Sequence, residues 1–144
     1  MDALAQLSFL VHNALAEIAG QHDLSIIQTR LLGVLRDRKP TMNALGRLLG
    51  LDKSSVSGLV DRAQRRGLVT RTVSAIDRRA LQVSITDTGR QLVEQVAARF
   101  TERIETLAAG LPDADRQLLS RLAARIVAAD ADRRGIDLRT DPAP

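Results

Sequence analysis

SGLVDRAQRRGLVTRTVSAIDRRALQVSIT, residues 57–86, changes its hydrophobic period halfway along. Its first part carries apolar residues at the three- and four-residue spacing of a helix, which is expected to end at Gly67. The period then becomes two, which predicts strands at 69–73 and 81–85. The residues between the strands, 74–80, are polar and basic. This stretch therefore predicts a helix followed by a hairpin with arginines at its tip.

Upstream of this unit the apolar spacing predicts three more helices. The first ends near Gly20, and the second runs from an N-cap at Ser25 to about residue 37. A short third helix begins at Thr41 and stops at Gly50, and Asp52 is placed to cap the helix that enters the quoted stretch.

Two further helices are predicted downstream. Thr86 is the expected cap of a long helix, which Gly110 and Pro112 end. The last helix is expected over 113–129, with four apolar residues at helical spacing. The polar segment 130–144 is expected to be a mobile tail, or to prolong this helix by one turn. These elements predict a mainly α fold with a two- to three-stranded β-wing, an α+β class.

Composition excludes several classes of function. The chain has 144 residues, of which 44% are hydrophobic, and it has no cysteine and two histidines. No apolar run is long enough for a membrane span and no signal peptide is evident, so a cytoplasmic protein with no membrane partner is expected. We find no convergent nucleophile and base, no phosphate-binding glycine loop and no metal-ligand cluster. The chain is therefore not expected to be an enzyme, and no cofactor or metal is predicted.

Charge is concentrated in one part of the chain. The net charge is +4, and residues 53–79 hold seven basic side chains against two acidic ones. Such a local concentration is typical of a nucleic-acid binder. Two short helices joined by LLGL (48–51) have the arrangement of a helix-turn-helix, and a hairpin directly after them is the order of a winged helix. The alternative is an ordinary α+β domain with a solvated basic face.

The sequence resembles the multiple antibiotic resistance regulator (MarR) family of bacterial transcription factors. LDKSSVSGLVDRAQRRGLVTR (51–71) and DRRALQVSITDTG (77–89) carry the resemblance, and the second includes the family's wing signature of DRR, a strand and T-x-x-G. The sequence departs from the family pattern at Gly58, at Thr72 and in the VSAI segment (73–76).

The resemblance implies different roles for different segments of the chain. Residues 1–38 would support a dimer, 39–87 would form a winged helix-turn-helix lobe that binds DNA, and 88–129 would link and dimerise. The apolar faces of the terminal helices also favour a partner, although they could pack on each other within one chain. The implied partners are double-stranded DNA carrying an inverted repeat, and a second copy of the chain in a homodimer.

The resemblance also implies roles for individual residues. The helix over 53–66 would be the recognition helix in the major groove, and its start would meet base edges and phosphates. The wing arginines would reach the minor groove, with Arg79 the better candidate for insertion. Asp61 and Asp77 would position a wing arginine, while Arg66 and Arg71 would contact phosphate or be solvated. The predicted DNA-binding residues are Thr41, Lys53, Ser54, Ser55, Ser57, Arg62, Arg65, Arg78 and Arg79.

The signal that such a protein senses is less determined by the sequence. Many members of the family are repressors that release DNA when a small phenolic or aromatic ligand binds, and this is the expected behaviour. Its ligand-binding residues are unknown, although Ser8, His12, Asn13 and Arg30 could line a pocket. Without cysteine a redox sensor is excluded. The alternative function is a winged helix for non-specific DNA packing or for protein–protein contact without ligand response.

Overall fold

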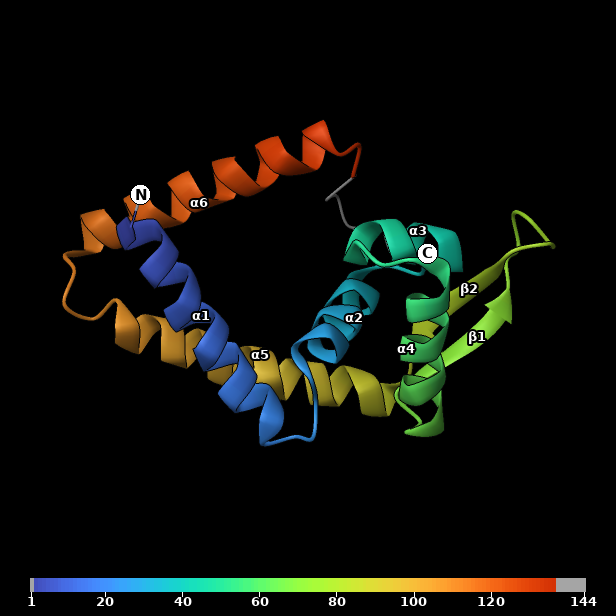
Figure 1. The fold of residues 1–144 in the computed structure, drawn as a ribbon. Coiled ribbons are helices and arrows are strands. Elements are labelled where there is room, and N and C mark those ends of the chain that lie inside the picture. Colours follow the sequence, from blue (N-terminus) through green and yellow to red (C-terminus); the bar gives the residue numbers. More distant parts are fainter. Residues whose placement is uncertain (1, 137–144) are drawn as a thin grey trace.

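The computed structural model describes residues 2–136, and Figure 1 shows their arrangement. The elements follow the predicted order of helices and hairpin, so the mainly α fold with a β-wing is confirmed. They are α1 (Asp2–Gly20), α2 (Ile26–Asp37), α3 (Met42–Leu49), α4 (Lys53–Arg65), β1 (Val69–Val73), β2 (Leu81–Ile85), α5 (Asp87–Leu107) and α6 (Asp113–Arg133). Among the described residues, no helix is both long and apolar enough to cross a bilayer.

Side-chain caps define where four of the helices begin. The predicted caps Ser25, Thr41, Asp52 and Thr86 each accept a hydrogen bond from a backbone N–H of the first helical turn. Such a bond satisfies a donor that has no partner within the helix. At the other end of α3, Gly50 has a φ of 68°, a conformation that favours glycine. Local sequence therefore fixes these boundaries, as predicted.

Strands β1 and β2 form an antiparallel pair in which Val69 lies opposite Ile85 and Val73 lies opposite Leu81. A third strand is reduced to a single bridge between Thr41 and Gln82. The wing therefore has two strands, the lower of the two numbers expected.

The hydrophobic core lies between α2, α3, α4, the base of the hairpin and the first half of α5. Leucines of α2 and α3 and valines of α4 and the strands are almost fully enclosed. The largest enclosed side chains are Leu31, Leu32, Leu35, Leu45, Leu59, Val56, Val60, Val69, Val83 and Val96. We call α2, α3, α4, β1 and β2 the lobe, because they close this core together.

The T-x-x-G part of the wing signature joins the lobe to α5. The hydroxyl of Thr86 accepts from the Gly89 N–H and donates to the Gly67 carbonyl at 2.7 Å. A Cβ at Gly89 would lie 2.2 Å from the Leu68 carbonyl oxygen, closer than side-chain carbons approach backbone. Glycine is therefore required here because α5 begins in direct contact with the turn before β1.

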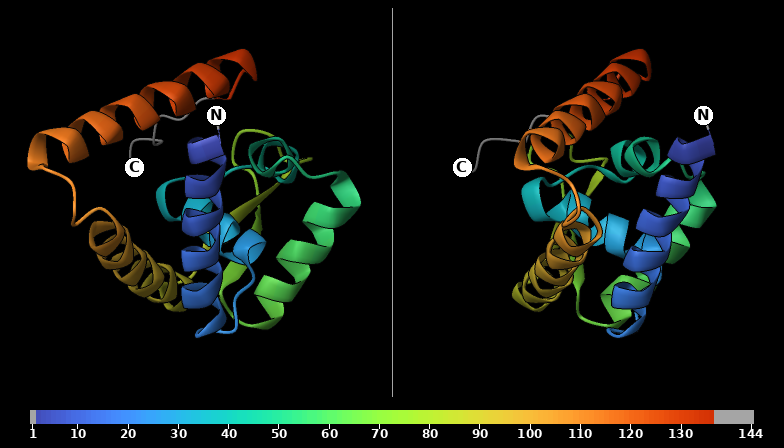
Figure 2. Two further views of the ribbon diagram at one scale, coloured as in Figure 1. Left: turned by 60° about the vertical axis from the view of Figure 1, so that its left-hand side comes forward. Right: turned by 90° about the vertical axis from the view of Figure 1, so that its left-hand side faces the viewer.

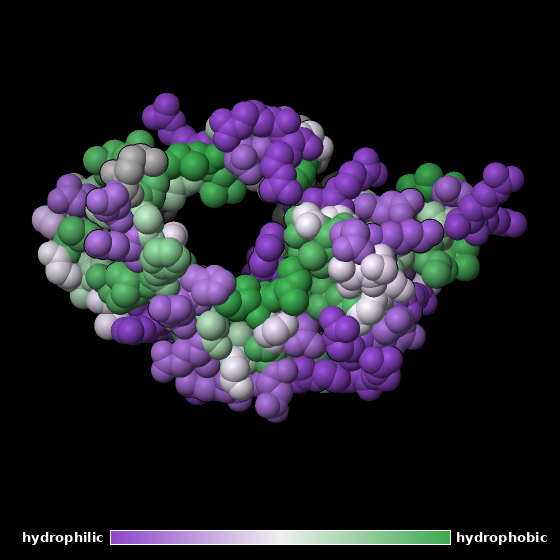
Figure 3. All heavy atoms as spheres, in the orientation of Figure 1, coloured by the Kyte–Doolittle hydropathy of each residue, from purple (hydrophilic) through white to green (hydrophobic). Residues whose placement is uncertain are grey.

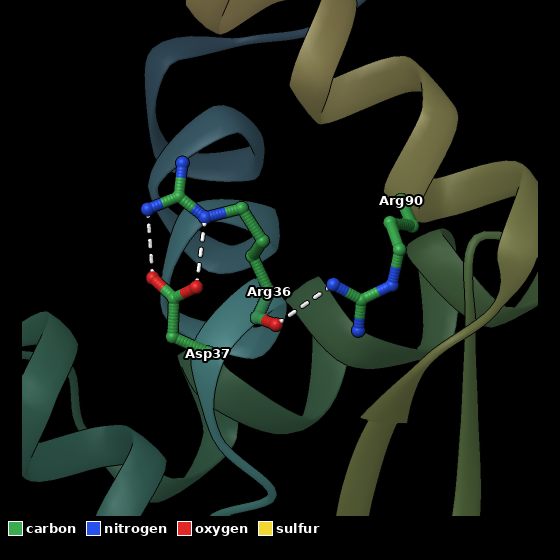
Figure 4. Close-up of polar contacts among 3 residues, drawn as sticks. All are labelled: Arg36, Asp37 and Arg90. Carbon is green, nitrogen blue, oxygen red and sulfur yellow. Dashed lines mark hydrogen bonds and ion pairs between the residues drawn. The ribbon is translucent and has the colours of Figure 1, made fainter. Parts of the chain in front are cut away.

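A second joint ties α5 to the end of α2 (Figure 4). The guanidinium of Arg90 donates to the Arg36 carbonyl at 3.0 Å, next to the ion pair of Arg36 and Asp37 at 2.7 Å. The hydrogen bond from Arg36 lowers the pKa of Asp37, and the charges of Arg36, Arg38 and Arg90 lower it further. Cations at a helix C-terminus also interact favourably with the helix dipole. Arg90 therefore fixes the direction in which α5 leaves the lobe.

Most of helix α6 stands clear of the lobe (Figures 1 and 2), and only its C-terminal end approaches α2 and α3. It buries only Ala131, and its apolar stripe of Leu118, Leu119, Leu122 and Ile126 remains 42–60% exposed. The possibility that α1 and α6 cover each other within one chain is therefore wrong for this stripe. Figure 3 shows an opening through the molecule below α6, with hydrophobic side chains along its rim.

The end of α6 agrees with the second of the two expectations for the polar segment. The helix continues to Arg133, about one turn beyond residue 129, and Gly135 follows with a φ of 62°. Residues 130–133 therefore prolong the last helix. The remainder of the expected tail, 137–144, lies outside the described residues.

Candidate nucleic-acid interface

A groove of about 790 Å³ lies between α3, the start of α4 and the wing. Four basic residues and no acidic residue line it. Of the predicted DNA-binding residues, the groove brings together Thr41, Lys53, Ser57 and Arg79. The other basic residues are Arg47 and Arg71. A concave surface with cations alone concentrates positive potential and attracts phosphate.

Sequence analysis did not assign Arg47 to this surface. It lies on the exposed side of α3, and nothing in its immediate sequence distinguishes it from other solvated arginines. The feature that could have assigned Arg47 to this surface is its position on the polar face of the short helix directly before the recognition helix.

The first turn of α4 is organised by Asp52. Its carboxylate accepts the Ser54 hydroxyl at 2.7 Å, the Ser55 hydroxyl at 2.7 Å and the Ser55 N–H at 2.9 Å. The bonds from the serine hydroxyls lower the pKa of Asp52 below its ordinary value. Both serine protons are thus directed to Asp52, and the two serine oxygens are left to accept hydrogen bonds.

The acid within α4 pairs with a different arginine from the one expected. Asp61 forms an ion pair with Arg71 of β1 at 2.6 Å, not with Arg79 at the wing tip. Arg71 also donates to Gln64 and to the Ser57 carbonyl, at 3.3 Å each. The expected pairing is wrong because β1 runs alongside α4 while the tip projects beyond it (Figure 1). Arg71 is therefore held against α4 and is not a freely solvated side chain.

At the wing tip Asp77 acts on the backbone. Its carboxylate accepts from the Arg79 N–H at 2.9 Å. The guanidinium groups of Arg78 and Arg79 make no hydrogen bond or ion pair with other described residues, and both residues are exposed. Asp77 therefore shapes the loop that carries the arginines without pairing with their charges.

The remaining arginines of the quoted stretch have different environments. Arg66 donates to the carbonyls of Asp23 at 2.6 Å and His22 at 3.2 Å, so its side chain is tied to backbone and is not freely solvated. It braces the end of α4 against the turn after α1. Arg65 is exposed without a partner among the described residues. Arg62 lies over Gly58, where a Cβ would be 3.3 Å from its guanidinium.

A second groove of about 440 Å³ lies between α2, α3 and the end of α6. Arg30, one of the residues considered for a ligand pocket, lines it together with Val34, Leu48, Val127 and Arg134. Ser8, His12 and Asn13 line neither groove and are exposed on α1. Within residues 2–136 no three His or carboxylate groups are placed to hold a metal ion.

Comparison with known proteins bears on this geometry. A family model described as "MarR family" matches residues 22–80, which include α2, α3, α4 and the start of the wing. A MarR-family regulator from Rhodococcus sp. RHA1 has the same fold over 86% of this chain and 89% of its own, at a TM-score of 0.74 and 25% identity. Over residues 22–80 the chain is therefore similar to the MarR family, and its fold is that of a solved MarR-family transcriptional regulator.

Two further similar proteins differ in how much of each chain the similarity covers. CouR from Rhodococcus jostii RHA1, solved with p-coumaroyl-CoA, is 25% identical and has a TM-score of 0.71, over 86% of this chain and 88% of CouR. The uncharacterised HTH-type regulator YwaE of Bacillus subtilis is 26% identical over 94 residues, which are 65% of this chain. The match spans 52% of YwaE, about half of that relative's length.

Proposed function

We propose that this chain is a sequence-specific DNA-binding regulator of the MarR family that acts as a homodimer on an inverted-repeat operator. The observation that carries the proposal is the groove between α3, α4 and the wing, whose charged lining residues are all basic. An active-site cleft would hold groups able to act as nucleophile, acid or base, whereas this lining offers cations, hydroxyls and amides. Such groups are those that contact phosphates and base edges.

The homodimer is supported by the uncovered faces of α1 and α6. Exposed apolar side chains on both helices include Phe9, Leu10, Leu122 and Ile126. A contiguous apolar face of this kind marks an interaction surface. Because each chain offers one recognition helix, a two-fold dimer would read two half-sites about 34–36 Å apart. The opening below α6 has the hydrophobic rim that a helix of a second copy would cover (Figure 3).

Within the lobe, the proposed contacts divide into two kinds. Lys53 contacts phosphate, and its loss weakens binding to all sequences alike. Arg79 enters the minor groove, where a narrow groove has the negative potential that favours an arginine, so its loss lowers specific affinity. Ser54 and Ser55 read bases as acceptors, because their protons are held by Asp52. Their partners are then the amino groups of cytosine and adenine, which are the major-groove donors. Ser57 is a further base contact. The sugar-phosphate backbone of the DNA is contacted by Thr41, Arg62, Arg65 and Arg78.

Asp61 and Asp77 take positioning roles in this proposal. Asp61 restricts Arg71 at the edge of the groove, and Asp77 holds the backbone of the wing tip. An acid that restricts an arginine reduces the entropy lost on binding. Removing either carboxylate is therefore expected to weaken DNA binding, although the change makes the surface more positive.

Ligand response is proposed as repression released by a small aromatic acid. The groove between α2, α3 and α6 supports this, since it combines apolar side chains with Arg30 and links the lobe to α6, while its Arg134 is paired with Asp130 at 3.6 Å. CouR carries an aromatic acyl thioester in its structure. A ligand held between α3 and α6 would favour one placement of the lobe relative to the rest of the dimer, which is how a ligand shifts a two-state equilibrium.

The test is selection of duplexes from a random library by the full chain, followed by titration of the recovered sequence. An inverted repeat bound by a dimer at 0.15 M salt, at least about 1,000-fold tighter than random competitor, is expected for a specific regulator. Binding that shows no sequence preference would favour a packing protein instead. A monomer on a single half-site would contradict the homodimer.

A further inference from the structure

The tip of the wing exposes a large apolar side chain. Ile76 is 95% exposed, and Val73 and Leu81, which face each other across the hairpin below it, are 60% and 45% exposed. Burying an isoleucine side chain stabilises a folded protein. The isoleucine contributes almost none of this stabilisation to the folded chain, so its presence at the tip is unexplained by stability.

The loop that carries Ile76 is held by hydrogen bonds. Ser74 is buried, and its hydroxyl accepts from the N–H groups of Ile76 and Asp77 at 3.3 Å each. The Ser74 N–H donates to the Ala80 carbonyl at 2.9 Å, and the Ala80 N–H donates to the Asp77 carbonyl at 2.9 Å. Together with the bond from the Arg79 N–H to Asp77, these contacts fix the loop. Ile76 is therefore presented outward by a preorganised turn, which reduces the entropy lost on binding.

The surroundings of Ile76 indicate its partner. Arg78 and Arg79 follow it in the same loop, and Arg79, Ala80 and Leu81 line the basic groove that also contains Lys53. The apolar tip is thus continuous with the candidate DNA surface and projects beyond it (Figure 1). Arginines beside an exposed aliphatic side chain match a narrow groove with negative walls and apolar sugar faces. Proteins that bind the minor groove often insert an aliphatic wedge between base steps.

We propose that Ile76 enters the minor groove beside Arg79 as an apolar wedge against a base step in each flank of the operator. This inference rests on the proposed DNA-binding function. It adds a residue that would contribute to sequence specificity by favouring operators whose base steps deform easily. Pyrimidine–purine steps open most easily. The wing is therefore expected to favour a TA or CA step at the position that Ile76 reaches, without any hydrogen bond to a base.

The experiment compares Ile76→Ala, Ile76→Asn and Ile76→Leu with the wild-type chain. Each is titrated, by fluorescence anisotropy, against the duplex that the wild-type chain selects from a random library. We expect Ile76→Ala and Ile76→Asn to bind about tenfold more weakly and Ile76→Leu to bind within about threefold of wild type, since an aliphatic group is retained. Because the side chain is exposed, melting temperatures of all variants should match.

Salt dependence separates the role of Ile76 from that of the neighbouring charge. Ile76→Ala should leave the slope of log affinity against log salt unchanged, because an isoleucine displaces no counterions. Arg79→Ala should lower the magnitude of that slope by about one for each phosphate that the arginine neutralises in the wild-type complex. A changed slope for Ile76→Ala would mean that the loop had moved its arginines, and it would overturn the wedge.

A second duplex tests the base step. The pyrimidine–purine step in each flank is replaced by an A-tract step, and wild type is expected to lose affinity while Ile76→Ala does not. Equal losses for both proteins, or selected duplexes without such a step, would overturn the inference. Equal affinity of wild type and Ile76→Ala for the selected duplex would also overturn the inference. The exposed tip would then be expected to bind a protein partner instead. If the wild-type chain selects no duplex, the proposed function fails as well, and this result is distinct from the others.

Discussion

Helices α4 and α6 have similar apolar stripes in the sequence and opposite environments in the structure. In α4 the stripe of Val56, Leu59, Val60 and Ala63 is at most 2% exposed, because it lies in the core and α3 and β1 pack against this helix. In α6 the stripe of Leu118, Leu119, Leu122 and Ile126 is 42–60% exposed. An amphipathic pattern tells which face of a helix is buried and does not tell what buries it. The α4 stripe is covered by other parts of the same chain, whereas the α6 stripe is left for another molecule to cover.

The largest effect is expected from a charge on the α6 face. Leu122→Asp should weaken self-association by at least about 100-fold, because a two-fold interface would bury two unpaired carboxylates. Ser120→Asp, on the opposite side of the same helix, is the matched control and should change little. Sedimentation equilibrium measures both. Loss of the lobe's fold in Leu122→Asp, seen by circular dichroism, would contradict the independence of the two regions.

The next effect concerns the joint between the lobe and α5. Gly89→Ala should lower the free energy of unfolding by about 2–3 kcal/mol, since its Cβ would collide with the Leu68 carbonyl and backbone must shift. Gly33→Ala in α2 is the matched control, because nothing lies within 4 Å of its Cβ. It should raise stability by up to about 1 kcal/mol. Chemical denaturation measures the free energy of unfolding of both variants. Equal changes would contradict the close contact between the start of α5 and the turn before β1.

A smaller effect is expected at the brace between α4 and the turn after α1. Arg66→Ala should cost about 1 kcal/mol, because two carbonyls lose a charged donor at an exposed site. Arg65→Ala, its neighbour without a partner among the described residues, should cost less than about 0.5 kcal/mol. The comparison is made by urea denaturation. Equal costs would mean that the recognition helix is held by its apolar stripe alone.

The smallest effect is a pH dependence within the lobe. Because hydrogen bonds from Ser54 and Ser55 lower the pKa of Asp52 in the folded chain, the ionised carboxylate stabilises the fold above the unfolded pKa of about 3.9. This contribution is lost as pH falls toward the folded pKa. Asn is also a good N-cap but does not ionise. The gap in melting temperature between wild type and Asp52→Asn should therefore be largest at pH 5–7 and shrink toward pH 3. A constant gap would contradict the role assigned to the charge.

The sequence alone determined the elements, their order and their boundaries within a few residues. This was possible because helix caps and strand periods depend on neighbours in the chain: Thr86 caps α5 through the Gly89 N–H three residues on. The placement of Thr41, Lys53, Ser57 and Arg79 around one groove also followed the predicted site, because family resemblance carries the lobe's arrangement. Their roles on DNA stay predictions.

Only the tertiary structure decided which charges meet. Asp61 pairs with Arg71, and Arg66 reaches carbonyls more than 40 residues away, because these partners depend on how β1 and the turn after α1 pack against α4. The exposure of the α6 stripe and of Ile76 was likewise set by packing. A periodic pattern specifies a face through local geometry, whereas the partner of a face or a charge is set by contacts between distant parts of the chain.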